Sequence, residues 1–143
     1  RTSANRNCGV NARGTATIEQ CTVYGNRYGI YASGANSVIY SSSVSSNRGY
    51  GVYAAGSSAT IYRNTVQSNG GDGITARGSY AKIYYNTANR NRGSGISSSS
   101  YRAVIAYNRA SYNSYYGIYS SGKKTTLAKN SATGNRKRNI RRG

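Results

Sequence analysis

The sequence predicts an all-β protein folded as a right-handed parallel β-helix, a solenoid of about 6.5 coils of 22 residues with three short strands per coil and no capping helix. Apolar residues recur at a spacing of 22, at Ile30, Val52, Ile74, Ile96, Ile118 and Ile140. Within a coil, apolar residues form short pairs with a period of two, which indicates strands and not helices. Glycine and asparagine separate these pairs, and both residues favour turns. We therefore expect residues 1–143 to form a single β-helix domain.

Each predicted coil carries three columns of apolar residues, one for each strand. The first strand carries Val10 and then the column that begins at Ile30. The second strand carries the column of Ile18, Ile39, Ile61, Ile83, Ile105 and Leu127. The third strand carries the column of Val23, Val44, Val66, Ala88, Ala110 and Ala132. Crossovers between parallel strands are almost always right-handed, and this rule gives the predicted handedness.

Asparagines occupy two further columns at the turns on either side of the third strand. The first column contains Asn64, Asn86, Asn108 and Asn130. The second column contains Asn26, Asn47, Asn69, Asn91, Asn113 and Asn135. Stacked asparagine amides can hydrogen-bond to one another along a solenoid. Because the pattern returns in almost every coil, we interpret these residues as structural ladders and not as ligand-binding groups.

The segment Ile61–Ile74 carries the motif Ile-x-x-Asn-x-Val-x-x-Asn followed by Gly-Ile. This motif resembles the parallel β-helix repeats of the pectate-lyase-like superfamily, including its carbohydrate-binding and sugar-hydrolase repeats, and it covers nearly the whole chain. The resemblance implies the fold but no single activity, because that superfamily includes lyases, hydrolases, epimerases, phage tailspikes and inert adhesins. A leucine-rich repeat is the competing solenoid, but it needs several leucines per unit, and this chain contains only Leu127.

The charge is strongly positive, with 20 Lys and Arg against two acidic residues and a formal net charge of +18. Such a balance implies a polyanionic partner, either an acidic polysaccharide or nucleic acid. The alternative is a basic surface that only keeps the protein soluble. The predicted polyanion-binding residues follow the asparagine ladder or lie in the last coil: Arg6, Arg27, Arg48, Arg92, Lys123, Lys124, Arg136, Lys137, Arg138, Arg141 and Arg142.

Residues that support catalysis or bind metals are scarce. The chain has no histidine, and its only acids are Glu19 and Asp72. The resemblance implies clusters of aspartate, often with calcium, or aspartate pairs for glycoside hydrolysis. Glu19 and Asp72 fall in different columns more than two coils apart, so we expect no carboxyl pair, no metal site and no cofactor. The sequence therefore predicts a protein that is not an enzyme and has no small-molecule substrate.

Tyrosines fall mainly in outward columns, where rings of successive coils can stack. They either stiffen the solenoid or form a platform for sugars, bases or a neighbouring fibre. The predicted platform contains Tyr31, Tyr40, Tyr53, Tyr62, Tyr84, Tyr85 and Tyr107. The two cysteines fall in different columns, which disfavours an internal disulfide, and Cys8 is a candidate for a cross-link between subunits.

Neither terminal coil carries a recognisable cap, and open strand edges template pairing with another copy of the chain. Our leading hypothesis is a structural subunit that stacks head to tail into an extracellular or cell-surface filament. The alternatives are a module that binds acidic polysaccharide or nucleic acid, and a degenerate carbohydrate-active β-helix. No apolar run of about 18 residues occurs, so we expect no membrane span.

Overall fold

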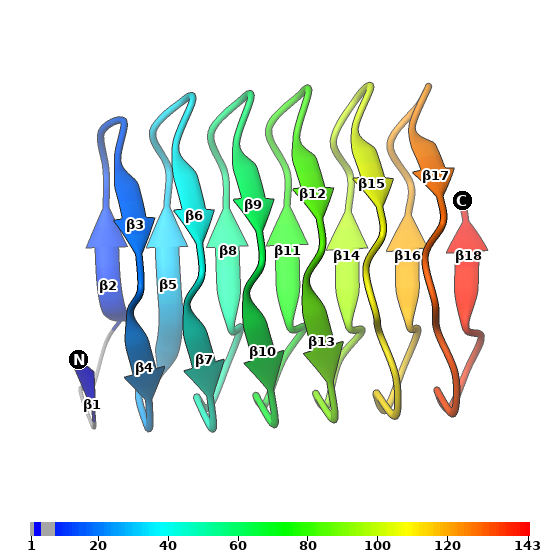
Figure 1. Cartoon of the computed structure of the whole chain (residues 1–143), viewed down its shortest axis with the longest axis horizontal. Coiled ribbons are helices and arrows are strands. Elements are labelled where there is room, and N and C mark those ends of the chain that lie inside the picture. The colour runs from blue at the N-terminus through cyan, green and yellow to red at the C-terminus, as the bar shows by residue number, and fades with distance from the viewer. Residues whose placement is uncertain (1, 4–7) are drawn as a thin grey trace.

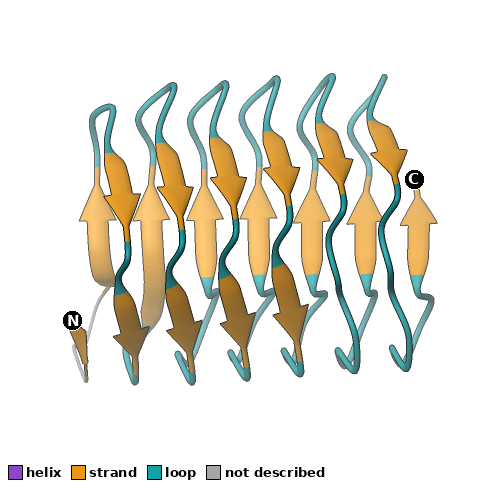
Figure 2. Ribbon diagram, in the orientation of Figure 1, coloured by secondary structure: helices purple, strands orange, loops and turns teal. Residues whose placement is uncertain are grey.

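The structure is a computed structural model, and it describes the backbone of residues 2–3 and 8–143 and the side chains from residue 9 onward. The described chain winds through three parallel sheets, and its coils stack along the long axis of a solenoid (Figure 1). Strands and turns alternate throughout, and no described residue lies in a helix (Figure 2). The predicted parallel β-helix is therefore confirmed over the described residues.

Three sheets, which we call A, B and C, run along the solenoid. Sheet B contains β2 (Cys8–Ala12), β5 (Tyr28–Ala32), β8 (Val52–Ala54), β11 (Ile74–Ala76), β14 (Ile96–Ser98), β16 (Ile118–Ser120) and β18 (Ile140–Arg142). Sheet C contains β3 (Thr17–Glu19), β6 (Val38–Tyr40), β9 (Thr60–Tyr62), β12 (Lys82–Tyr84), β15 (Val104–Ala106) and β17 (Thr126–Ala128). Sheet A contains β1 (Thr2–Ser3), β4 (Thr22–Tyr24), β7 (Ser43–Ser45), β10 (Thr65–Gln67) and β13 (Thr87–Asn89).

The chain passes from sheet B to sheet C to sheet A once per coil, so that neighbours within a sheet are successive coils. The pairing keeps a straight register, with Ile74 opposite Val52 on one side and Ile96 on the other. A straight register places equivalent residues of successive coils in line. Each column read from the sequence is therefore a physical row on the inside or the outside of the solenoid.

The core is a narrow stack of isoleucine, valine and alanine from all three sheets. Strand side chains alternate between faces, and in β9 only the central residue, Ile61, is fully buried. The largest fully buried side chains are Val23, Ile30, Ile39, Val44, Val52, Ile61, Val66, Ile74, Ile83, Ile96, Ile105 and Ile118. These residues come from the three predicted apolar columns.

Two asparagine ladders close the turns on either side of sheet A. Asn86 shows the pattern: its side-chain amide donates to the carbonyl of Ile61 at 2.9 Å and to Oδ1 of Asn108 at 3.0 Å. Its own Oδ1 accepts from the backbone and the side chain of Asn64, at 3.0 and 3.1 Å. Asn64, Asn86 and Asn108 are almost fully buried. The ladders therefore satisfy buried backbone groups that the strands cannot pair.

Sheet A ends earlier than the other two sheets, which corrects the expectation of three strands in every coil. After β13, only isolated bridges join Thr87 to Arg109 and Arg109 to Ser131. The cause lies at Asn89, whose side-chain oxygen accepts the backbone N–H of Ser111 at 2.8 Å. A side chain thus takes the donor that would continue the strand ladder.

The turn between sheets C and A uses positive φ at residues that are neither glycine nor asparagine. Arg63, Tyr85 and Tyr107 have φ values of 54°, 57° and 57°, and each directly precedes a ladder asparagine. This conformation is unfavourable for a large L-residue unless the surroundings impose it. The hydrogen-bonded asparagine that follows holds the turn and directs Tyr85 and Tyr107 outward, where both rings are exposed.

Candidate functional site

The outer face of sheet B carries one row of side chains whose residue type changes from coil to coil along the solenoid. The row is fixed by strand register and contains Asn11, Tyr31, Tyr53, Thr75, Ser97, Tyr119 and Arg141. Aromatic residues stand near both ends of this row, and small hydroxyl residues stand between them. At about 4.8 Å per strand, Tyr53 and Tyr119 are separated by three strand spacings, or roughly 14 Å.

A second row lies three residues earlier, at the turn that leads into each strand of sheet B. It contains Tyr28, Tyr50, Asp72, Ser94 and Tyr116. The two rows border the same strands, and together they line a series of surface hollows. We call this series the sheet B groove.

The first part of the groove is a hollow of about 310 Å³ lined by four tyrosines and Arg77. The rings of Tyr28 and Tyr50 stack with their centroids 6.1 Å apart, and those of Tyr31 and Tyr53 stack at 5.4 Å. The Arg77 guanidinium lies 5.7 Å from the centroid of the Tyr53 ring. We call this feature the tyrosine hollow, and it combines aromatic surface with a fixed positive charge.

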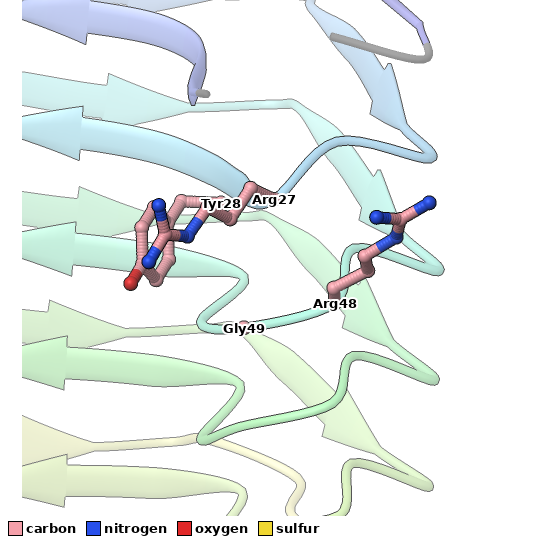
Figure 3. A pocket seen from close by; sticks show the side chains of 4 residues that line it. All are labelled: Arg27, Tyr28, Arg48 and Gly49. Carbon is pink, nitrogen blue, oxygen red and sulfur yellow. The ribbon is translucent and has the colours of Figure 1, made fainter. Parts of the chain in front are cut away.

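A neighbouring hollow of about 460 Å³ is lined by Arg27, Tyr28, Arg48 and Gly49. Figure 3 shows the Arg27 side chain folded along Tyr28, whereas the Arg48 side chain extends in another direction. The Arg27 guanidinium lies 5.3 Å from the Tyr28 ring centroid. Gly49 is required here, because a Cβ at this position would lie 2.6 Å from the Tyr28 ring. The two arginines therefore widen the positive rim of the groove instead of forming a single row.

The middle of the groove is built around Asp72. Its Oδ1 accepts the backbone N–H of Ser94 in the next coil at 2.7 Å, and the Thr75 hydroxyl lies 3.5 Å from Oδ2. A hollow of about 230 Å³ beside it is lined by Asp72 and Arg77 together with Thr75, Ser97, Ser99, Tyr119 and Ser121. We call it the Asp72 hollow. Its hydroxyl groups can donate and accept hydrogen bonds to a polar ligand.

Burial raises the pKa of the Asp72 carboxyl group above its ordinary value of 3.8, because desolvation disfavours the charged form. The hydrogen bonds from Ser94 and Thr75 and the positive charge of Arg77 oppose this shift but do not cancel it. Asp72 thus holds a proton more readily in the folded chain than in the unfolded chain.

We expect Asp72→Asn to raise the free energy of unfolding at pH 7. A carboxyl group whose folded pKa is raised contributes stability that is fully present below its unfolded pKa and is lost as pH rises through its folded pKa. The neutral amide keeps the acceptor for the Ser94 N–H and avoids burying a charge. Urea denaturation from pH 7 to below 3.8 should show the gap between variant and parent closing as pH falls. A gap that is constant or widens with falling pH contradicts this account.

The far part of the groove is a hollow of about 360 Å³ where Asp72, Ser94 and Ser97 meet Tyr115, Tyr116, Tyr119 and Arg141. The rings of Tyr116 and Tyr119 stack at 5.2 Å, and the Arg141 guanidinium lies 5.4 and 5.9 Å from their centroids. Arg141 also donates a hydrogen bond to the Tyr116 hydroxyl. The tyrosine and arginine combination of the tyrosine hollow is thus repeated on the other side of Asp72.

The sequence of the chain matches a known family over residues 8–141, and that family is described as the right handed beta helix region. The chain belongs to this right-handed β-helix family. Membership confirms the predicted handedness and the predicted resemblance to β-helix repeat proteins.

One solved structure similar to this β-helix is the A-module of mannuronan C-5 epimerase AlgE4 from Azotobacter vinelandii, with a TM-score of 0.76 and 16% sequence identity. The alignment covers 92% of this chain and 44% of the epimerase module, so the β-helix spans less than half of that structure. At this identity the likeness establishes the fold. A search of curated sequences found no match.

The predicted basic residues are distributed over the β-helix: Arg141 lines the groove, and Arg27 and Arg48 line the neighbouring hollow. Arg6 lies outside the described residues. The remaining predicted residues are exposed away from the named hollows, and they are Arg92, Lys123, Lys124, Arg136, Lys137, Arg138 and Arg142. Arg77 also lines the groove, and Arg13 lines a further hollow beside Tyr28 and Tyr31, so that two arginines and one acid line the groove and three arginines line hollows next to it.

The predicted tyrosine platform divides between two faces. Tyr31 and Tyr53 lie in the groove. The other five, Tyr40, Tyr62, Tyr84, Tyr85 and Tyr107, lie on the outside of sheet C and the turn that follows it. In the sheet C column, parallel rings cover each other at 4.9 and 5.1 Å, so the column presents ring edges and hydroxyl groups outward.

Several groove residues were not among the predicted site residues: Tyr28, Tyr50, Asp72, Arg77, Tyr115, Tyr116 and Tyr119. The available signal was the three-residue offset between the two rows, which places both at the same strand edge. Asp72 is half-buried, because its carboxylate packs against the backbone of the next coil.

The remaining polar candidates lie apart from one another. Glu19 belongs to β3 of sheet C, whereas Asp72 precedes β11 of sheet B, so the two acids sit on different faces. Among the described residues, no cluster of three or more His, Cys, Asp or Glu side chains could hold a metal ion. Cys21 is a free thiol that donates to the Glu19 carbonyl at 3.2 Å. The Cys8 side chain lies outside the described residues, and no helix in the described part could cross a membrane.

Proposed function

We propose that this β-helix binds an acidic polysaccharide along the sheet B groove. The observation that carries the proposal is the repeated pairing of tyrosine rings with an arginine on either side of the hydroxyl-lined Asp72 hollow. Elongated ligands suit a row of connected hollows better than compact ligands do. The tyrosine hollow and the Asp72 hollow share Arg77, so one chain can pass from the first to the second.

Charge supports an anionic ligand. Two arginines and one half-buried acid line the groove, three more arginines line the hollows next to it, and the whole chain carries a net charge of +18. Arg77 and Arg141 stand over tyrosine rings, where each guanidinium is held in place and can still donate to a carboxylate. These two arginines flank Asp72 and are the residues we assign to carboxylate recognition.

Hydroxyl groups favour a sugar over a nucleic acid. Thr75, Ser97, Ser99 and Ser121 surround the Asp72 hollow and offer both donors and acceptors. A carboxylate in the same hollow can accept hydrogen bonds from sugar hydroxyls, which the backbone of single-stranded DNA lacks. The epimerase that shares this fold acts on mannuronan, and for that reason mannuronan oligomers are the first ligand to test.

The ligand class is tested by measuring binding to polymannuronate, to neutral dextran and to a single-stranded oligonucleotide at several salt concentrations. We expect polymannuronate to bind with an affinity that falls as salt rises, because the arginines release the cations that are condensed on its carboxylates. Dextran should bind weakly or not at all. Tighter binding of the oligonucleotide than of polymannuronate contradicts the proposal and favours a nucleic-acid module.

Stacking of chains into a filament was the leading hypothesis from the sequence, and it stays a prediction. The groove runs along the side of the β-helix and is compatible with either a free or a stacked chain. Sedimentation and electron microscopy of the protein at moderate salt distinguish the two states. Fibres with a regular axial repeat support the filament, and a strict monomer that binds polymannuronate supports the binding module and rules out the filament.

A further inference from the structure

Five tyrosines on the sheet C side form an unbroken chain of ring contacts that the proposed groove does not use. The ring centroids of Tyr40 and Tyr62 are 4.9 Å apart, and those of Tyr62 and Tyr84 are 5.1 Å apart. Tyr84 then meets Tyr85 edge-on at 5.7 Å, and Tyr85 stacks on Tyr107 at 4.9 Å. We call these five residues the tyrosine chain.

The two ends of the tyrosine chain carry opposite charges. At one end, the Tyr40 hydroxyl donates a hydrogen bond to the carboxylate of Glu19. At the other end, the Lys129 ammonium group lies 5.3 Å from the centroid of the Tyr107 ring. Glu19 and Asp72 are the only acids in the chain, and Asp72 lies on another sheet. Within the tyrosine chain, Tyr40 is thus the residue whose hydroxyl group donates a hydrogen bond to a carboxylate.

This asymmetry matters for the loss of an electron from a phenol. A phenol that loses one electron becomes strongly acidic and releases its hydroxyl proton, so a hydrogen-bonded carboxylate makes the step easier. A nearby ammonium group opposes the positive charge that forms on the ring. Removal of an electron is therefore easiest at Tyr40 and hardest at Tyr107.

We propose that the tyrosine chain passes oxidising equivalents from its exposed members, Tyr85 and Tyr107, to Tyr40, which is the site where oxidative modification accumulates. The partner is a one-electron oxidant, such as a photo-oxidised metal complex or the ferryl haem of a peroxidase. The oxidant takes one electron from an exposed ring, Tyr85 or Tyr107. Each neighbouring ring then passes an electron to the oxidised ring, so that the missing electron is finally that of Tyr40. In the final state Tyr40 has lost its hydroxyl hydrogen: the proton is on Glu19, the electron is on the oxidant, and a neutral phenoxyl radical remains.

If the solvent exposure of each tyrosine ring alone decided where oxidation occurs, other tyrosines would be modified most. Tyr112 is the most exposed tyrosine among the described residues, at 63%, and Tyr85 follows at 53%. Tyr40 is only half-buried and is less accessible than either. A diffusing oxidant that modified whichever ring it met first would therefore mark Tyr112 and Tyr85, and Tyr40 only weakly.

The test is photo-oxidation with a ruthenium tris-bipyridyl complex and persulfate, followed by peptide mass spectrometry of hydroxylated tyrosines. The hydroxylated product forms when the oxidant removes a second electron from the phenoxyl radical and water then adds to the ring with loss of a proton, and persulfate is the final acceptor of both electrons. Both cysteines are replaced by serine in every variant, so that thiols do not compete for the oxidant. We expect the yield at Tyr40 to exceed that at Tyr112 by about tenfold, reflecting the charge-assisted hydrogen bond to Glu19. Glu19→Gln should remove that excess.

Tyr62→Phe provides the decisive variant, because phenylalanine keeps the stacked ring but is much harder to oxidise. It should lower the yield at Tyr40 by about tenfold and raise it at Tyr84 and Tyr85, whereas Tyr101→Phe, outside the tyrosine chain, should change neither. Circular dichroism confirms that each variant is folded. Yields that follow exposure, with Tyr112 and Tyr85 highest and Tyr40 unchanged by Tyr62→Phe, overturn the proposal. Because groove residues are untouched, this outcome is independent of polysaccharide binding.

Discussion

Replacing Asn86 by alanine is expected to lower the free energy of unfolding by about 3–5 kcal/mol, because it leaves several buried polar groups without partners at about 1–3 kcal/mol each. The carbonyl of Ile61 loses the Asn86 amide as a donor, and the Oδ1 atom of Asn108 keeps only the backbone N–H of residue 86. The backbone N–H of Asn64 loses its acceptor, and the side-chain amide of Asn64 keeps only the Ile39 carbonyl. All these groups lie inside the solenoid, where water cannot replace the missing partner.

The effect should also spread along the solenoid, because each coil is held mainly by its two neighbours. Urea denaturation followed by circular dichroism measures the loss. Asn11→Ala is the matched control, since Asn11 is exposed on the outer face of sheet B, and it should change stability by less than about 0.5 kcal/mol. Equal effects of the two substitutions contradict a structural role for the ladder.

The inside of the solenoid could be predicted from the sequence because the same apolar residues and asparagines return at the same positions in successive coils. Ile61, Ile83 and Ile105 stand 22 residues apart and face the same way in every coil, so that one interpretation fits all coils. The ladder asparagines follow from the same regularity. At Asn89 the repeat failed, because a side-chain oxygen there takes the N–H of Ser111 and ends sheet A early. A column pattern does not show whether a backbone N–H such as that of Ser111 will donate to a backbone carbonyl or to a side-chain oxygen.

The groove was harder to predict because its rows change residue type from coil to coil. Tyr53, Thr75 and Tyr119 share one outward row, yet no repeat links them chemically. Arg77 follows the end of a strand and not a ladder asparagine, so it falls outside the basic residues that the asparagine ladder predicts. Its place over Tyr53 depends on side-chain packing across two coils. The sequence columns predict on which face of the solenoid a residue such as Arg77 lies, but they do not predict which side chains it contacts.

The double substitution Tyr53→Ala with Arg77→Ala is expected to weaken polymannuronate binding by about 30- to 100-fold, or roughly 2–3 kcal/mol. Tyr53 contributes a wall of the tyrosine hollow, and Arg77 lines both this hollow and the Asp72 hollow. Tyrosine and arginine held against each other are the residue types that most often dominate binding energies. Arg77→Gln alone keeps the tyrosine wall of the hollow. It should weaken polymannuronate binding less than the double substitution does, and it should reduce the salt dependence of the affinity.

The matched control is Tyr62→Ala with Arg63→Ala, which removes the same residue types from the sheet C side. The measurement that tests binding in the groove most directly is the polymannuronate affinity of these two double variants at one salt concentration, with both shown to be folded by circular dichroism. We predict the large loss for the sheet B pair and a change of less than about threefold for the sheet C pair, which lowers only the overall charge. Equal losses in the two variants would show that polymannuronate responds to net charge and not to the sheet B groove, and would contradict the proposed function.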